Sequence, residues 1–307
     1  MRKTTLIAIS PATHGDLYHD WGKALAFCAA LPDVSPPAPV TFHMFWRQRR
    51  AAFWRKTRPF GRKQALPVKA FYATQDLSRC SLVLWSDEDL SGNAWLQPFA
   101  PHLTLRIYQP EMEVRGTPLA DRPDLYRQQD HRVWRDGDLF RILALHNYGG
   151  VYLDMDMVVL RSLGALLSQE FVYQWDVFDG EYNGALMHLR QGSAFARELI
   201  AGVLAIPPSE FNWGKENLKR AIELGRTITV FPCPFFDTEW HADPRFQPFK
   251  NTPNSARLYE GAFAWHWHNR WDDPIQEGSK FHRLEALIDQ ALLARPLKTA
   301  WSGQAPA

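Results

Sequence analysis

The stretch from residue 138 to residue 163, DLFRILALHNYGGVYLDMDMVVLRSL, limits the fold of this chain more than any other part of the sequence. Its first half repeats leucine and isoleucine at helical spacing, and the Gly-Gly pair at 149–150 supplies the positive φ that ends a helix. The apolar run VYL at 151–153 follows at once, with Asp154 and Asp156 directly after it. The stretch therefore predicts a helix, a tight break and a short strand that carries two carboxylates at its end.

The two aspartates are expected to share one side of the strand, because successive residues of an extended chain point to opposite faces. Met155 and Met157 should then point to the other side. Two neighbouring carboxylates repel each other, and a divalent cation that bridges them to a ligand phosphate keeps both ionised. A solvated turn after a strand is the simpler explanation of an isolated Asp-x-Asp triplet. The longer pattern around this triplet favours a metal-diphosphate site instead.

This stretch resembles the sugar-binding DXD region of retaining GT-A glycosyltransferases, specifically glycosyltransferase family 32 and, more distantly, the large clostridial glucosylating toxins. In these families an Asp-x-x-Arg on a helix precedes a Tyr-x-Asp-x-Asp strand, and together they hold a nucleotide sugar. The resemblance implies that Asp138 and Arg141 grip the sugar hydroxyls, while Tyr152 helps to hold the nucleotide sugar. It also implies that Asp154 contacts ribose and sugar, and that Asp156, with Asp154 beside it, binds the metal. The implied fold is α/β, of the GT-A (Rossmann-like) class, with a mostly parallel sheet flanked by helices.

A second motif of the same families lies upstream of this stretch. The alternating run VTFHMFW at 40–46 predicts a first strand, and His43 and Trp46 match a His-x-x-Trp whose tryptophan stacks on uracil. A buried core tryptophan explains Trp46 equally well, because aromatic residues are common at the ends of core strands. Trp46 is therefore a candidate for binding the base of the nucleotide.

Near the carboxyl terminus, the segment HWHNRW at 266–271 resembles a loop of these enzymes with the pattern His-x-x-x-x-Trp. The resemblance implies that His266 joins the metal ligands and that Asn269 completes the metal and diphosphate shell. It also implies that Trp271 donates a hydrogen bond to the β-phosphate. A lone histidine is more often a satisfied core or surface residue, so this alternative stays open for His266.

Turn signals follow the two aspartates. Asp179-Gly180 and Asn183-Gly184 both predict turns of a hairpin, and such turns explain these residues adequately. In the resembling enzymes a polar residue at this place approaches the donor sugar, so Asn183 and Asp179 are candidates for that role. Further on, Lys215 follows a glycine where the family usually has Gly-Pro, so the loop on the acceptor side is not predicted.

The segment between Phe45 and Asp76 contains basic residues and no acidic residue. Aromatic residues are interleaved with the basic ones over residues 47–63. This combination suits an anionic membrane surface or an anionic acceptor, where each basic residue contributes on the order of 1 kcal/mol. A merely solvated face is the main alternative. Nucleic acid is not an expected partner, because no nucleic-acid-binding fold signature lies nearby.

Helical and strand patterns alternate along the chain, which favours a mostly parallel sheet covered on both faces. Ligands in such folds lie at the carboxyl ends of the strands, where Trp46 and the two aspartates would meet. The expected helices cover residues 16–31, 68–79 and 192–205, and the further strands cover 81–89, 103–111 and 228–236.

With 307 residues and 46% apolar content the chain can bury one large core, so a single GT-A domain is expected at 40–295. Residues 1–39 are expected to be an extension that packs on this domain, and residues 296–307 a disordered tail. Three cysteines at wide spacing indicate buried thiols in a reducing compartment. No apolar run approaches the ~20 residues of a membrane span. A cytoplasmic location is therefore expected, with a peripheral contact at the inner membrane face as an addition.

The function expected from the resemblance is transfer of a hexose or N-acetylhexosamine from a UDP-sugar to a hydroxyl of a glycan acceptor. Mn²⁺ or Mg²⁺ is the expected cofactor, retention of configuration is implied, and the implied pathway makes cell-surface polysaccharide or lipid-linked glycans. Two alternatives come from other classes. The run from Asp154 to Val158 also fits the first motif of a HAD-type phosphohydrolase, with Asp154 as covalent nucleophile. The other alternative is a catalytically silent sugar-nucleotide binding protein.

Overall fold

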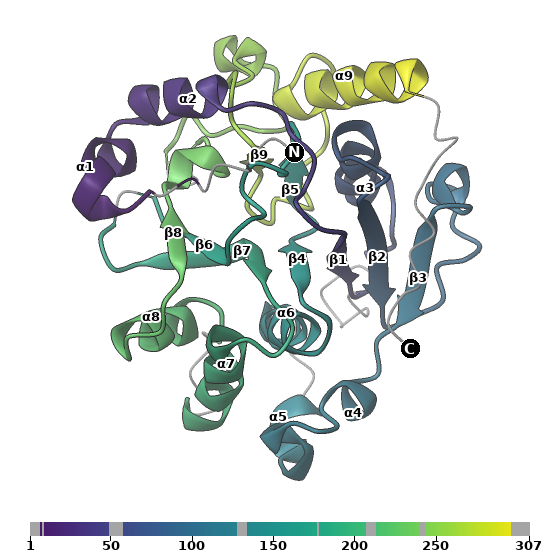
Figure 1. The fold of residues 1–307 in the computed structure, drawn as a ribbon. Helices are drawn as coiled ribbons and strands as arrows, with labels where there is room; N and C mark the ends of the chain where they lie inside the picture. Colours follow the sequence, from purple (N-terminus) through teal and green to yellow (C-terminus); the bar gives the residue numbers. More distant parts are fainter. Residues whose placement is uncertain are drawn as a thin grey trace.

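A seven-stranded mixed sheet forms the centre of the computed structural model, which describes residues 7, 9–48, 58–127, 134–176, 178–206, 213–239 and 243–295. Its strands are β1 (Val40–Trp46), β2 (Cys80–Ser86), β3 (Leu103–Ile107), β4 (Gly150–Leu153), β6 (Phe171–Gln174), β7 (Tyr182–Leu189) and β8 (Thr229–Phe231). They lie in the order β3-β2-β1-β4-β7-β6-β8 (Figure 1). The pairings of β1 with β2 and β4, of β2 with β3 and of β6 with β8 are parallel, whereas β7 runs antiparallel to β4 and β6. The predicted α/β class with a mostly parallel sheet is confirmed.

Helices cover both faces of the sheet (Figure 1). One face carries α1 (Pro11–His19), α2 (Trp21–Ala30), α3 (Arg62–Thr74) and α9 (Lys280–Ala294), together with a small sheet of β5 (Met157–Val159) and β9 (Ala264–His266). The other face carries α4 (Pro110–Glu113), α5 (Pro123–Tyr126), α6 (Trp134–Tyr148), α7 (Ala194–Ala205) and α8 (Lys215–Glu223). Strands that are covered on both faces are rich in apolar residues, and the described residues of β1 and β2 are nearly all buried.

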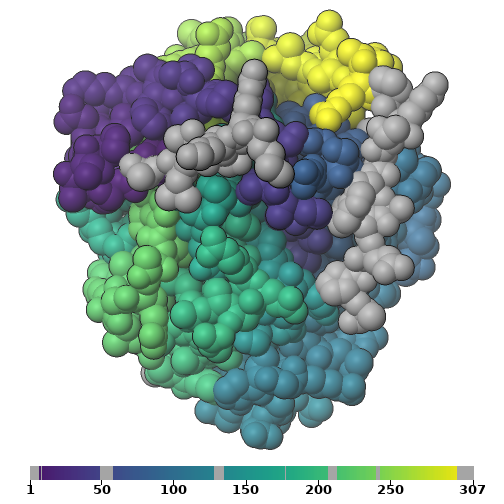
Figure 2. All heavy atoms as spheres, in the orientation of Figure 1, coloured from purple at the N-terminus to yellow at the C-terminus, as the bar shows by residue number. Residues whose placement is uncertain are grey.

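The N-terminal helical segment differs from the prediction. The expected single helix at 16–31 is two helices that break at Asp20, whose carboxylate accepts the N–H of Lys23 at 3.0 Å and so caps α2. Tyr18 is fully buried, and its hydroxyl donates to the Val230 carbonyl at 2.5 Å. In Figure 2 the purple N-terminal residues lie at the same end of the molecule as the yellow C-terminal helix. The division of the chain into extension, domain and tail stays a prediction.

The Gly-Gly break ends α6 as predicted. Gly149 and Gly150 have φ of 66° and 95°, and a Cβ on Gly150 would lie 2.1 Å from the Thr41 carbonyl oxygen. The absence of a side chain lets the start of β4 lie against β1. His43, on β1, is buried beside this turn: it accepts a hydrogen bond from Trp85 on Nδ1 (3.2 Å), so its Nε2–H donates to the Gly149 carbonyl (3.0 Å). The His43 of the His-x-x-Trp motif thus supports the turn that starts β4.

The basic segment is only partly described, because residues 49–57 lie outside the described ranges. Within the described part, Arg62 binds Glu285 through Nη2 at 2.6 Å and Arg58 binds Asp272 at 3.1 Å. Lys63 points inward and is 9% exposed. The prediction of a surface contact was therefore wrong for Lys63, because backbone carbonyls of a distant turn surround its ammonium group.

The three cysteines, Cys28, Cys80 and Cys233, are free and buried, as predicted. Among the helices that the structure describes, none combines the length and the apolar character that crossing a bilayer requires.

Candidate functional site

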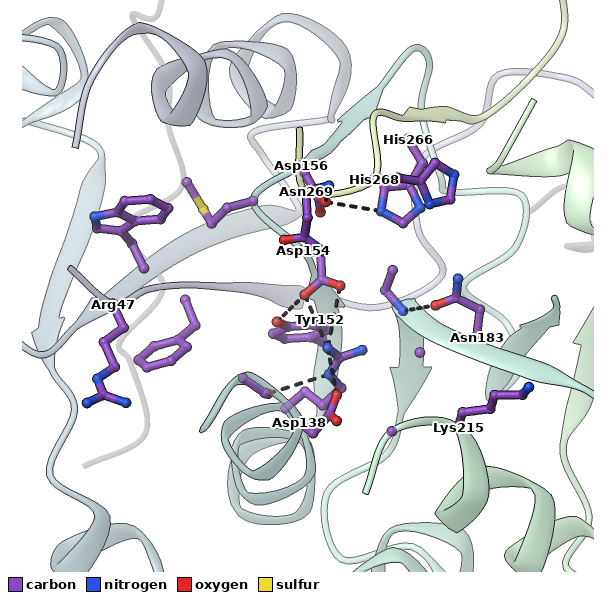
Figure 3. A pocket seen from close by; sticks show the side chains of 18 of the residues that line it. Arg47, Asp138, Tyr152, Asp154, Asp156, Asn183, Lys215, His266, His268 and Asn269 are labelled. Carbon is purple, nitrogen blue, oxygen red and sulfur yellow. Dashed lines mark hydrogen bonds and ion pairs between the residues drawn. The ribbon is translucent and has the colours of Figure 1, made fainter. Parts of the chain in front are cut away.

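A cavity of about 700 Å³ lies at the carboxyl ends of β1 and β4. Ten of the site residues predicted from the sequence line it, and Figure 3 labels seven of them. These residues are Trp46, Asp138, Arg141, Tyr152, Asp154, Asp156, Asn183, His266, Asn269 and Trp271. They come from β1, α6, β4 with the turn that follows it, β7, and β9 with the turn that follows it. The cavity position agrees with the expectation for an α/β sheet, although their individual roles stay predictions.

The two aspartates lie in a turn and not on an extended strand. β4 ends at Leu153, and the N–H of Met157 donates to the Asp154 carbonyl at 3.0 Å. Met155 also lines the cavity, so the prediction that it points away from the aspartates was wrong. The Asp154 N–H donates to the Ala185 carbonyl on β7 at 2.8 Å, which keeps the start of the turn attached to the sheet. A tight turn, and not strand alternation, therefore brings both carboxylates to the cavity.

Arg141 joins two of the carboxylates from α6. Its Nη2 lies 3.0 Å from Asp138 Oδ1 and 3.4 Å from Asp154 Oδ1, and the Tyr152 hydroxyl donates to Asp154 Oδ1 at 2.5 Å. Burial disfavours the charge of Arg141, but attraction to Asp154 and Asp138 outweighs it and raises its pKa. Burial raises the pKa of Asp154, although Arg141 opposes this shift. The result is an ion triad of largely buried side chains at the end of β4, of which Figure 3 labels Asp138 and Asp154.

Asp156 faces a second group of residues. The N–H of Asn269 donates to Asp156 Oδ2 at 2.6 Å, and His266 Nε2 lies 3.3 Å from the same oxygen. His266 reaches this place because β9 pairs with β5 directly after the aspartates, with His266 opposite Met157. Asp237 lies behind the histidines, with its Oδ2 at 3.3 Å from His266 Nδ1 and its Oδ1 at 2.9 Å from His268 Nε2. Two carboxylates therefore flank one buried imidazole.

These residues fit a divalent cation. His266 Nε2 is buried and makes no hydrogen bond, although it faces the Asp156 carboxylate. When Asp237 accepts the Nδ1–H, the neutral ring keeps its lone pair on Nε2, as a metal-ligating histidine does. An anionic oxygen and an imidazole nitrogen at this separation are donors that Mn²⁺ accepts. The donor atoms of Asp237, His266 and His268 also lie within 4.8 Å of one another.

Without a cation, His266 is protonated at neutral pH. Burial lowers the pKa of His266, but the charges and hydrogen bonds of Asp156 and Asp237 outweigh this effect and raise it to about 10. Burial alone would raise the pKa of Asp156 and of Asp237. The charges and hydrogen bonds of the neighbouring histidines lower these pKa values by more than burial raises them, so both lie below the usual value of an aspartate. The imidazolium thus balances the two carboxylates.

We expect the metal-free protein to lose about 3 kcal/mol of stability as the pH rises from about 7 to about 10. The pKa of His266 is about 10 in the folded protein and about 6.5 in an unfolded chain. Its stabilising contribution is therefore fully present below about pH 6.5 and is lost as the pH rises through the folded value. Urea unfolding in EDTA across this range, compared with His266→Gln, measures it. Equal pH slopes for the two proteins would contradict the assignment.

Trp46 fits both explanations that the sequence left open. It belongs to the buried core and is 5% exposed, yet it lines the cavity. Its ring packs edge to face against Trp271, with centroids 5.3 Å apart, and against Phe60 at 6.2 Å. Base stacking by Trp46 stays a prediction.

Asn183 lies inside β7, so the predicted turn at Asn183-Gly184 was wrong, whereas the hairpin of β6 and β7 around Asp179-Gly180 is confirmed. The Asn183 Oδ1 accepts the N–H of Ala185 at 2.8 Å, and the residue lines the cavity. Asp179 is exposed, with its carboxylate 3.8 Å from His19 Nε2, and is not among the residues lining the cavity.

Sequence reasoning missed three residues that shape the site. A Cβ on Gly184 would lie 3.2 Å from Arg141 Nη1, and one on Gly214 would lie 2.7 Å from Asp138 Oδ1. Both glycines therefore leave the space that the Asp138–Arg141 pair occupies. Asp237 was missed too, and its signal is an acidic residue directly after the apolar run FPCPFF.

Residues 106–173 match a protein-family model described as "Glycosyltransferase sugar-binding region containing DXD motif". An uncharacterized protein of Arabidopsis thaliana is 42% identical over 64 residues, which are 20% of this chain and 10% of that protein. The matched segment thus spans about a tenth of the length of the plant protein.

Solved structures of similar fold are glycosyltransferases of low sequence identity. The structure titled "PaToxG Glycosyltransferase" is 13% identical, with a TM-score of 0.47, covering 70% of this chain and 79% of that chain. The apo-form glycosyltransferase GlyE in Streptococcus pneumoniae TIGR4 is 11% identical, with a TM-score of 0.48, covering 87% of this chain and 66% of that one. Mouse xyloside xylosyltransferase 1 is 10% identical, with a TM-score of 0.45, covering 77% of this chain and 100% of that chain. On the family match, residues 106–173 of this chain are similar to the glycosyltransferase sugar-binding regions that contain a DXD motif.

Proposed function

We propose that this protein is a GT-A glycosyltransferase that uses Mn²⁺ or Mg²⁺ to move a hexose or N-acetylhexosamine from a UDP-sugar to a glycan hydroxyl. The proposal rests on one observation. Asp154, Asp156 and His266 line the same cavity as the ion pair of Asp138 and Arg141. The match over residues 106–173 supports it, since a DXD motif implies a divalent metal and a nucleotide sugar in general. A role in making cell-surface polysaccharide or lipid-linked glycans rests on the family resemblance.

The ion triad suits recognition of a sugar. Carboxylate oxygens of Asp138 and Asp154 accept hydrogen bonds from hydroxyls, and the guanidinium of Arg141 donates them. Arg141 Nη2 contacts both carboxylates, so each acceptor is held in place before the sugar binds. Charged, preoriented partners of this kind bind hydroxyls more strongly than neutral ones, and the triad would thereby set the orientation of the donor sugar.

The metal would be held by Asp156, Asp154 and His266. When bound, a divalent cation neutralises the charge that develops on the departing diphosphate. The residues of the turn after β9 act beside it. The Asn269 N–H donates to the Asp156 carboxylate at 2.6 Å. The Trp271 Nε1–H donates to Asn269 Oδ1 at 2.9 Å, and rotation of the indole would let it donate to a β-phosphate instead.

We also propose retention of configuration by attack on the face from which the leaving group departs. The carboxylates among the described residues lining the cavity are Asp138, Asp154 and Asp156, and each faces Arg141 or His266. None is therefore offered as a covalent nucleophile. The acceptor oxygen would bond to the anomeric carbon as the bond to the phosphate oxygen breaks, and the acceptor proton would pass to that phosphate. Anomeric NMR of the product tests this, and an inverted linkage would rule it out.

A panel of UDP- and GDP-sugars with Mn²⁺ tests the whole proposal. Slow hydrolysis of one UDP-sugar in the absence of acceptor is the expected result. Turnover of p-nitrophenyl phosphate would favour a phosphohydrolase with Asp154 as nucleophile. Donor binding without turnover would favour the silent binding protein.

Trp46→Ala is expected to weaken UDP binding by about 1 to 3 kcal/mol if the ring stacks on the base. Pyrophosphate lacks a base, so its affinity for the Mn²⁺-loaded protein should remain within about twofold of wild type. Calorimetric titration of folded protein with each ligand measures both. Equal losses for UDP and pyrophosphate would show that Trp46 acts only through the core.

A further inference from the structure

The turn that carries Asn269 and Trp271 to the cavity has a rare backbone conformation. His268 and Asn269 have φ of 54° and 56°, in the left-handed region that residues other than glycine seldom adopt. This conformation directs the Asn269 N–H at Asp156, and the indole of Trp271 at the Asn269 side chain. Such a backbone persists only where the surrounding structure holds it.

Lys63, near the start of α3, binds the backbone directly after these two residues. Its Nζ donates to three carbonyl oxygens of the turn, those of Arg270, Trp271 and Asp273, at 2.8, 2.9 and 2.6 Å. An ammonium group carries three N–H donors and no acceptor, so three converging carbonyls use all of them. A side chain without these donors would remove the ammonium hydrogen bond from all three carbonyls of the turn.

The ammonium group is buried despite the cost of removing a charge from water. Its Nζ lies 3.6 Å from the centroid of the Phe249 ring, and the residue is 9% exposed. Burial lowers the pKa of Lys63 to about 8, while nearby aspartates oppose this shift and nearby arginines add to it. The charged groups that face it are Asp272, Asp273, Arg58 and Arg270.

Lys63 projects from a helix that is itself fixed. Arg62 Nε donates to Glu285 on α9 at 2.9 Å. This pair joins α3 to α9, and the buried face of α3 packs into the core. Lys63 therefore connects the 268–273 turn to a helix that packs on the core.

We propose that Lys63 is a positioning residue for nucleotide-sugar binding. Its three hydrogen bonds hold the 268–273 turn so that Asn269 and Trp271 already face the diphosphate position when the donor arrives. Lys63 is not among the residues that line the cavity, so it acts through the turn. That the ligand is a nucleotide sugar rests on the proposed function. The hydrogen bonds by which Lys63 stabilises the turn do not depend on it.

Lys63→Met tests this, since methionine keeps the apolar stem and removes the donors. Lys69→Met is the matched control, because Lys69 lies on the same helix and pairs with Asp289 instead of the turn. Hydrogen exchange of the backbone amides at 268–274 is measured without ligand. We expect it to rise about tenfold in Lys63→Met only. The Kd for UDP with Mn²⁺ and the KM for the donor should rise about tenfold, with kcat changed less than about threefold.

Unchanged exchange at 268–274 in folded Lys63→Met would overturn the proposal. Faster exchange with an unchanged Kd for UDP would overturn it too, because Lys63 would then stabilise the fold without positioning the donor site. If the wild-type protein binds no UDP, the proposed function fails, and the exchange measurement still decides whether Lys63 holds the turn. If Lys63→Met does not fold, Lys63→Gln is measured in the same way, with the same outcomes deciding.

Discussion

Asp156→Asn is expected to lower transfer by about a thousandfold or more and to weaken Mn²⁺ binding by at least about a hundredfold. Asp156 is 3% exposed, and its carboxylate faces His266 and accepts the N–H of Asn269. Asparagine has nearly the same shape, so the packing survives while the negative charge is lost. A hard cation binds an amide oxygen far more weakly than a carboxylate.

The measurement is a Mn²⁺ titration followed by electron paramagnetic resonance, together with release of UDP from the donor. Asp124→Asn is the matched control, since Asp124 forms an exposed pair with Arg122 and is not among the residues lining the cavity. It should bind Mn²⁺ and turn over as the wild type does. Wild-type Mn²⁺ affinity in Asp156→Asn would remove the metal assignment.

Arg141→Met is expected to destabilise the fold by about 3 to 5 kcal/mol. The side chain of Arg141 is 12% exposed, and it lies between Asp138 (12%) and Asp154 (23%). Removing the cation takes the positive charge that Asp138 and Asp154 share away from two largely buried carboxylates. Their pKa values should rise as a result, because protonation is then the least costly way to bury them.

Urea unfolding at neutral pH measures this loss. Arg122→Met removes a similar arginine from a surface pair whose partners are 43% and 51% exposed, and it should cost less than about 1 kcal/mol. Adding Asp138→Asn and Asp154→Asn to Arg141→Met should recover part of the stability. A loss in Arg141→Met no larger than that of the surface control would show that the triad is not a buried ion network.

The central part of the site could be predicted because its signals are local. The helical spacing before the Gly-Gly pair, the VYL run and the two aspartates all lie within one short segment. The structure gives α6, a left-handed break at Gly149 and Gly150, and β4 at those places. The side on which Met155 would lie could not be predicted in this way, because the chain turns directly after Leu153.

The predicted boundaries of one helix and one strand were wrong, and both elements contain or adjoin prolines. The expected helix at 68–79 is α3 (Arg62–Thr74), which runs through Pro67 and starts where the Gln64 side chain accepts the Gly61 N–H at 3.0 Å. The expected strand at 228–236 stops at Phe231, since Pro232 and Pro234 have no N–H to donate to a sheet. A short 3₁₀ turn follows and places Asp237 beneath the histidines.

The residues that support the site from a distance could not be predicted. Asp237 and Lys63 act on segments roughly 30 and 207 positions away, and no local pattern encodes such a contact. Lys63 even gave a misleading signal, because it belongs to a run of basic residues that suits a surface.

The pairing of β5 with β9 has a consequence for the order of assembly during synthesis. Met157 directly follows Asp156, yet its partner in this small sheet, His266, is made more than a hundred residues later. On the ribosome, the segment with both aspartates emerges long before His266, whose Nε2 lies 3.3 Å from Asp156 Oδ2. A nascent chain that ends before residue 264 would therefore contain Asp138, Arg141 and Asp154 but lack the imidazole that we propose as a metal ligand.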